Sequence, residues 1–144
     1  MIIRQGTESD LNKIGRLWLE MVRELTPNYT PMLDWWKAIT INLMRNNKEY
    51  YVFVADDNGK IVGFLDFLLL AEASTGKVQA LGRHYYVKPE YRKTKIASEI
   101  YHESCEEAIK RGAKAFTLLC LPKGVRFWKK RGFKIDEVSM RMEM

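Results

Sequence analysis

The sequence is poor in the residues that build disulfide frameworks and metal centres. Its 144 residues include two cysteines, Cys105 and Cys120, and two histidines, His84 and His102. The cysteines lack C-x-x-C spacing, and the histidines have no metal-ligand spacing, which argues against a zinc or redox site. Both cysteines fall within apolar patterns, so we expect buried free thiols and no bound metal.

Long apolar runs and linker-like segments are also missing. No apolar stretch approaches the roughly 20 residues that a membrane-spanning helix needs. The opening residues, MIIRQGTESDL, contain no apolar segment of signal-peptide length. We therefore expect a cytoplasmic protein with no membrane partner. No Pro/Gly/Ser-rich linker or internal repeat divides the chain, which predicts one domain over residues 1–144.

Two common phosphate-binding motifs are absent although the chain is basic. It contains neither the GxxxxGK[ST] sequence of P-loops nor a GxGxxG sequence after a strand. Lys and Arg number 24 against 18 Asp and Glu, giving a net charge of +6. This balance favours phosphate-bearing partners such as nucleotide cofactors or nucleic acid, but solvated surface lysines would explain it equally well.

Hydrophobic periodicity predicts strands with helices between them. Apolar residues at helical spacing predict helices over residues 11–25, 32–47 and 94–112, and a short helix over 122–132. Strands are predicted over residues 2–5, 50–55, 60–71, 78–87, 113–121 and 133–144. Asn58–Gly59 predicts a two-residue hairpin turn. The order favours an α/β (α+β) fold with a mixed sheet covered by helices on both faces.

The segment VKPEYRKTKIASEIY, residues 87–101, places cations where a strand ends and a helix begins. Arg92, Lys93 and Lys95 there oppose the helix dipole, which favours negative charge at a helix start. Free backbone N–H groups at such a position bind anions, and added cations suit a pyrophosphate. We therefore predict an anionic ligand at the start of the helix over residues 94–112.

Three segments together resemble the GNAT acyltransferase family. Residues 87–101 are similar to its acyl-CoA-binding motif, V-x-P-x-[YF]-R-x-x-G-x-[AG], through Val87, Pro89, Tyr91, Arg92, Ile96 and Ala97. Lys95 stands where the family usually has glycine. Residues 121–135, LPKGVRFWKKRGFKI, resemble the family's N-x-x-A-x-x-F-Y-x-x-x-G-F segment, and residues 2–18 resemble its opening strand and helix. The resemblance covers essentially the whole chain, in register.

The resemblance implies a fold and a cosubstrate. The fold would be a GNAT-like mixed, mostly antiparallel sheet of about six to seven strands, with helices on both faces and a splayed pair of central strands. Acetyl-CoA would be the cosubstrate. Backbone groups of Tyr85 and Val87 would hold its pantetheine arm, and backbone N–H groups from Lys93 through Ala97 its pyrophosphate. The residues implied for its binding are Tyr85, Tyr86, Val87, Arg92, Lys93, Thr94, Lys95, Ile96, Ala97 and Phe127.

The implied reaction moves an acetyl group from acetyl-CoA to a primary amine by direct attack in a ternary complex. Trp128 replaces the tyrosine that binds the leaving sulfur in many family members. Its indole N–H can orient a sulfur atom but does not give up its proton near neutral pH. Candidates for the general base are His84, Glu72 and Asp66, of which His84 has the best intrinsic pKa. His84, Glu72, Trp128 and Tyr85 are the candidate catalytic residues.

Several alternatives stay open. The acceptor amine is not specified, and Trp35 and Trp36 either line an acceptor pocket or belong to the helix core. Trp128 and Lys95 also fit a non-catalytic acyl-CoA-binding relative, acting as a sensor or structural protein. A basic nucleic-acid-binding module is a weaker alternative, because no RRM, KH or helix-turn-helix signature is present. The resemblance also allows a homodimer.

Overall fold

The computed structural model describes all 144 residues and is built on a five-stranded sheet. The strands lie in the order β1 (Ile2–Gln5), β2 (Tyr50–Asp57), β3 (Lys60–Ala71), β4 (Val78–Val87) and β5 (Ala115–Leu118). The pairs β1–β2, β2–β3 and β3–β4 are antiparallel, whereas β5 runs parallel to β4. The predicted mixed, mostly antiparallel sheet is therefore confirmed.

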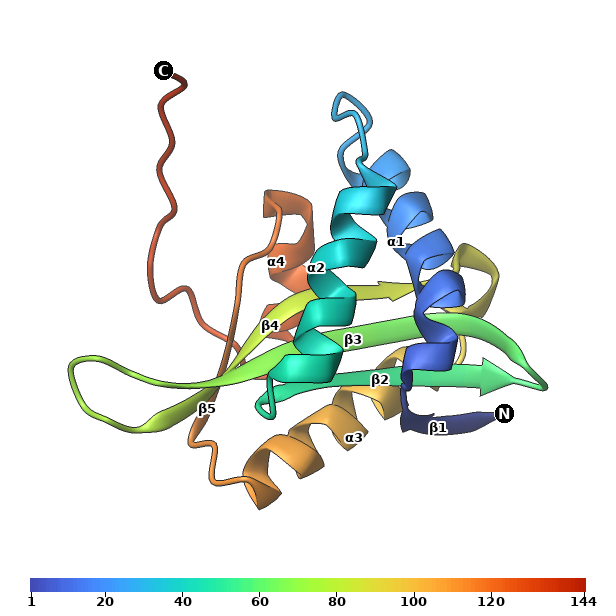
Figure 1. The fold of residues 1–144 in the computed structure, drawn as a ribbon. Helices are drawn as coiled ribbons and strands as arrows, with labels where there is room; N and C mark the ends of the chain where they lie inside the picture. Colours follow the sequence, from blue (N-terminus) through green and yellow to red (C-terminus); the bar gives the residue numbers. More distant parts are fainter.

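Helices cover both faces of this sheet, as predicted (Figure 1). The longer helices are α1 (Leu11–Leu25), α2 (Leu33–Asn46) and α3 (Ile96–Lys110), and α4 (Val125–Lys129) is a single short turn. α1 and α2 pack on one face and α3 packs on the other (Figure 1). None of these helices has the length and apolarity that crossing a membrane requires.

The central strand β3 explains why two helical layers are needed. Successive side chains of a strand point to opposite faces. Phe64 is buried with the α1 and α2 residues, whereas Leu65 and Phe67 are buried with α3. The hairpin that joins β2 to β3 has the positive φ angles of a two-residue turn, 50° at Asn58 and 90° at Gly59, as the sequence predicted.

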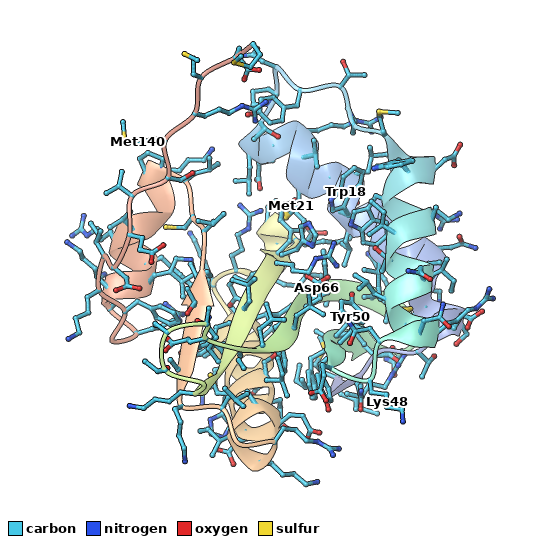
Figure 2. The ribbon with its side chains drawn as sticks, turned by 60° about the vertical axis from the view of Figure 1, so that its left-hand side comes forward. Trp18, Met21, Lys48, Tyr50, Asp66 and Met140 are labelled. Atoms are coloured by element: carbon cyan, nitrogen blue, oxygen red, sulfur yellow. The ribbon has the colours of Figure 1, made fainter.

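The predicted strand over residues 133–144 is wrong. No helix or strand follows α4, and the alternating apolar side chains of Val138, Met140 and Met142 are exposed. The segment runs away from the sheet to the C-terminus (Figure 1), with Met140 outside its layers (Figure 2). Alternating apolar and polar residues form a strand only when a partner strand is available, because an unpaired strand is not stable in water. The sheet therefore has five strands, not six to seven.

The predicted splayed pair of strands is β4 and β5. Only four residue pairs join them, from Gln79 opposite Ala115 to Gly82 opposite Leu118. Beyond Gly82, β4 continues to Val87 with no strand on its β5 side. At this point the pairing of β3 with β4 shifts by one residue, so that Arg83 forms a bulge. Bulges bend a strand and increase its twist, which suits the divergence seen here.

Candidate active site

A cleft of about 550 Å³ opens where β4 and β5 diverge. One wall is residues 82–87 of β4, and the other is residues 118–121, which are the last residue of β5 and the three that follow it. The second half of α1 covers one end, and residues from α4 and the first turn of α3 complete the lining. The divergence of two strands therefore produces a long groove that joins α1 to the start of α3.

The start of α3 presents backbone N–H groups that have no protein acceptor. From Lys93 to Ser98, only two backbone N–H groups donate within the protein. Thr94 donates to the carbonyl of Tyr91 at 3.2 Å, and Ile96 donates to the Thr94 hydroxyl at 3.4 Å. The N–H groups of Lys93, Lys95, Ala97 and Ser98 remain free. Free N–H groups of this kind form an anion-binding site at a helix start.

Three cations surround these free N–H groups. Lys93 and Lys95 are exposed and form no ion pair. Arg131, which follows α4, reaches Ser98 Oγ with Nη2 at 3.4 Å, and its guanidinium lies 3.4 Å from the centre of the Phe127 ring. The region therefore joins hydrogen-bond donors to uncompensated positive charge, the combination that a phosphate group requires.

Arg92 is anchored within the protein instead of being free. Its Nε donates to the Val87 carbonyl at 2.8 Å, and its Nη2 lies 2.5 Å from Glu24 Oε2 of α1. The guanidinium also lies over the Tyr86 ring, 5.2 Å from the centroid. The hydrogen bond to Glu24 raises the pKa of Arg92 above its usual value. Arg92 therefore ties α1 to the end of β4 beside the cleft.

A fully buried carboxylate holds a polar cluster at the other end of the cleft. Asp66 Oδ2 accepts a hydrogen bond from Tyr50 Oη at 2.8 Å and from Arg83 Nη1 at 3.0 Å, and Oδ1 lies 2.9 Å from His84 Nδ1. Figure 2 shows Tyr50 and Asp66 next to each other on the sheet. Burial opposes ionisation of Asp66, but its interactions with His84 and Arg83 and the hydrogen bond from Tyr50 outweigh burial and lower the pKa of this carboxyl.

The bulge in β4 brings Arg83 and His84 to the same face. Neighbouring residues of a regular strand point to opposite faces, yet both of these side chains bind Asp66 and both line the cleft. When His84 Nδ1 carries the proton, it donates to Asp66 and leaves Nε2 as a proton acceptor. The arrangement is that of a histidine oriented by a buried carboxylate.

Aromatic side chains close the side of the cleft nearest α3. The Trp128 ring lies 5.2 Å from Tyr85 and 5.1 Å from Phe127, measured between centroids. The Tyr85 hydroxyl donates to the Ala97 carbonyl at 2.7 Å, which fastens β4 to α3. Burial raises the pKa of Tyr85 well above its usual value. Tyr85 therefore acts here as a structural tie, with its proton held by the helix.

The indole N–H of Trp128 remains available for a ligand. The buried side-chain nitrogen and oxygen atoms without a hydrogen-bond partner are Trp36 Nε1 and Thr40 Oγ1, both on α2. Trp128 Nε1 is not among them, although no protein atom accepts its proton, so it keeps contact with solvent. Because Trp128 lines the cleft, this N–H is a free donor at its wall.

A comparison with protein-family models finds a match to the acetyltransferase (GNAT) family over residues 14–133. This match spans most of the 144 residues. The chain belongs to the GNAT family of acetyltransferases.

Solved structures of several acetyltransferases have a similar fold. An acetyltransferase from Trypanosoma brucei is 23% identical, with a TM-score of 0.74 and 99% of both chains covered. A ribosomal-protein-alanine N-acetyltransferase from Brucella melitensis is 18% identical, with a TM-score of 0.78 and 100% of both chains covered. An aminoglycoside acetyltransferase from a soil metagenomic sample, solved with sisomicin, is 19% identical, with a TM-score of 0.75, covering 99% of this chain and 95% of that one. A comparison with curated protein sequences found no match.

The GNAT cleft brings together most of the residues that the sequence singled out. It is lined by His84, Tyr85, Tyr86, Val87, Arg92, Ala97, Phe127 and Trp128. Lys93, Thr94, Lys95 and Ile96 form the turn and first residue at the α3 end. Glu72 lies elsewhere. It is at the tip of the β3–β4 hairpin, where it accepts a hydrogen bond from the Thr75 hydroxyl at 2.6 Å.

Some residues in and near the cleft were not predicted correctly from the sequence. Cys120 is exposed and lines the cleft, so the expectation of a buried thiol is wrong for it, while Cys105 is half-buried. Trp36 is core and Trp35 is exposed, and neither lines the cleft. Arg83 was missed because a bulge leaves no mark in the sequence pattern. The participation of α1 was missed because its inward side chains also fit ordinary helix packing.

Proposed function

We propose that this GNAT protein transfers an acetyl group from acetyl-CoA to a primary amine. One observation carries the proposal. A single cleft is lined at one end by Ala97, whose free N–H belongs to the start of α3, and at the other by His84, which is paired with Asp66. That arrangement fits an activated acyl donor whose diphosphate binds at one end of the cleft, while a base of the protein lies at the other end.

The residues present suit acetyl-CoA. The pyrophosphate would accept hydrogen bonds from the free N–H groups of Lys93, Lys95, Ala97 and Ser98, with Arg131 close by. The pantetheine arm would lie along β4 between Gly82 and Val87, where no strand occupies the β5 side. The bound thioester supplies the acetyl group and a thiolate leaving group.

His84 would act as the general base. Nε2 accepts a proton from the amine as its nitrogen bonds to the thioester carbonyl carbon and the carbon–sulfur bond breaks. Asp66 keeps the imidazole in place and stabilises it once it is protonated, because its buried carboxylate lies 2.9 Å from Nδ1. The products are an N-acetylated amine and free coenzyme A, and the proton leaves His84 to solvent.

Two further groups would stabilise the transition state. A backbone N–H of β4 beyond Gly82 that faces the cleft would stabilise the negative charge that develops on the carbonyl oxygen. The indole N–H of Trp128 would donate a hydrogen bond to the departing sulfur, and the thiolate leaves without being protonated by it. Phe127 and Tyr85 keep that side of the cleft apolar.

His84→Gln tests the proposal, with His102→Gln as a matched control. His102 is exposed on α3, and it does not line the cleft. We expect calorimetry to show that both variants bind acetyl-CoA as the parent protein does. Acetylated product, measured by mass spectrometry across a panel of amines, should fall about 100-fold or more for His84→Gln alone. Absence of acetyl-CoA binding, or full activity of His84→Gln, would contradict the proposal.

A non-catalytic acyl-CoA-binding role is the second candidate, favoured by tryptophan at position 128. Product formation across the panel of amines distinguishes the two, and Trp128→Tyr tests what residue 128 contributes. In an enzyme that uses the indole N–H, the variant should retain or gain turnover, since a phenol can both donate a hydrogen bond and protonate the thiolate. A protein that binds acetyl-CoA but forms no acetylated product with any amine in the panel would support the second candidate.

A further inference from the structure

The charged groups of the cleft are almost all positive. Its lining includes Arg83, Arg92 and Lys123 but only one carboxylate, that of Glu24. Glu24 is already paired with Arg92 at 2.5 Å. Lys123 is exposed and forms no ion pair. An acceptor with several ammonium groups would find no free carboxylate here, and burying its extra charges without partners is unfavourable.

Arg83 has hydrogen-bond donors to spare. A guanidinium carries five N–H donors, and in Arg83 only Nη1 has a protein acceptor, Asp66 Oδ2 at 3.0 Å. The side chain is 21% exposed and lines the cleft. The remaining donors keep the fork geometry that binds a carboxylate through two parallel hydrogen bonds.

The anion-binding group and the base are held side by side. Asp66 binds His84 through Oδ1 and Arg83 through Oδ2, so one buried carboxylate fixes both groups at adjacent positions of β4. A molecule that used both would need its amine and its anionic group close together. The α-amino and α-carboxylate groups of an amino acid, separated by one carbon atom, meet that requirement.

We infer that the acceptor is an α-amino acid with an apolar side chain, whose carboxylate is bound by Arg83 while its amine faces His84. This inference rests on the proposed function and names the substrate of the same cleft. Met21 and Leu25 of α1 and Leu119 after β5 supply the apolar lining for the side chain. Met21 lies on the α1 side of the polar cluster in Figure 2.

A series of related amines tests the inference on the parent protein. L-phenylalanine, L-phenylalaninamide and phenethylamine share one apolar body and differ in the carboxylate. We expect kcat/KM to be at least 10-fold higher for phenylalanine than for the other two, because a charge-assisted hydrogen bond is lost in each case. Spermidine, kanamycin and glucosamine 6-phosphate extend the series to polycationic acceptors and to a phosphate-bearing one.

Arg83→Met removes the proposed carboxylate-binding group, and Arg23→Met is a control that loses the same charge at an exposed position of α1 outside the cleft. Because Arg83 also binds Asp66, its loss can lower turnover of every acceptor. The readout is therefore the ratio of kcat/KM for phenylalanine to that for phenethylamine, in which a common loss cancels. We expect this ratio to fall about 10- to 100-fold in Arg83→Met and to be unchanged in Arg23→Met.

Several outcomes would overturn the inference. Equal turnover of phenylalanine, its amide and phenethylamine by the parent protein would do so, as would an unchanged ratio in Arg83→Met. Preference for spermidine, kanamycin or glucosamine 6-phosphate would reject the α-amino acid while leaving the proposed acetyltransferase function intact. Failure to bind acetyl-CoA by calorimetry would reject both. If Arg83→Met does not fold, Arg83→Gln provides the same ratio, and the parent series still decides the result.

Discussion

Asp66→Asn is the substitution with the most closely defined consequence. The Asp66 side chain is 1% exposed and its carboxylate contacts Tyr50, Arg83 and His84. Asparagine has nearly the same shape, but its amide nitrogen donates hydrogen bonds and cannot accept them. The amide oxygen can still accept from Tyr50 and Arg83, but the amide nitrogen then faces His84 Nδ1, which can accept from it only if the imidazole proton moves to Nε2. The Arg83 guanidinium also loses its counter-ion.

The magnitude follows from these contacts. Removing one partner of a buried ion pair destabilises a protein by about 3–5 kcal/mol. The Arg83 side chain is 21% exposed, so water can solvate part of the released charge, and the lower end of that range applies. We expect a loss of about 3 kcal/mol, which a domain of ordinary stability survives. Turnover should fall about 10- to 100-fold as well, because an amide cannot stabilise protonated His84.

Urea unfolding at neutral pH, followed by circular dichroism, measures the first effect. With a urea slope of about 2 kcal/mol/M, the midpoint should fall by about 1–2 M. Asp136→Asn, an exposed residue after α4, loses the same charge and should leave the midpoint unchanged. A midpoint for Asp66→Asn equal to that of the parent protein would refute the reasoning, because the three hydrogen bonds would then be energetically unimportant.

Three more predictions concern ligand binding, packing and acid stability. Arg92→Glu places a carboxylate beside the proposed diphosphate site and should weaken coenzyme A binding about 10-fold or more by calorimetry; equal affinity in a folded variant would reject that placement. Gly63→Ala puts a Cβ 2.9 Å from Ile100 Cδ1 and should destabilise by about 1–3 kcal/mol in the same urea assay. Hydrogen bonds from Arg4 lower the pKa of Asp10 to about 2, against the opposing effect of burial. The ionised Asp10 therefore adds about 2 kcal/mol to the free energy of unfolding above pH 4, and this stabilisation is lost as pH falls toward 2. Asp10→Asn should flatten the stability curve across that pH range, and an unchanged curve would contradict this.

The fold was predictable from the sequence wherever a short-range pattern decides the structure. Asn58–Gly59 favours one type of hairpin turn regardless of its surroundings, and the turn is present. The apolar spacing that predicted a helix over residues 94–112 is that of α3, whose Ile96, Ile100 and Ala108 are buried, although Ile109 of the same pattern is exposed. Such features depend on neighbouring residues alone, so the sequence shows them directly.

Features that depend on distant partners were not predictable in this way. Residues 133–144 alternate as a strand does, but strand formation requires an available partner, which the local pattern cannot show. The ion pair between Glu24 and Arg92 joins residues 68 positions apart. The shared use of Asp66 by Arg83 and His84 requires a bulge in β4, and the register between two strands decides where that bulge falls. The chemistry of the site depends on these long-range features.

The short seam between β4 and β5 has a consequence for the motions of the chain. Four rungs of pairing attach residues 115–118 to the rest of the sheet. We expect amide hydrogens of this last strand to exchange with deuterated water sooner than those of β3, which is paired along both edges. A ligand that lies between β4 and β5 and forms hydrogen bonds with both strands would replace the missing backbone hydrogen bonds. Amide exchange in β5 should then become slower.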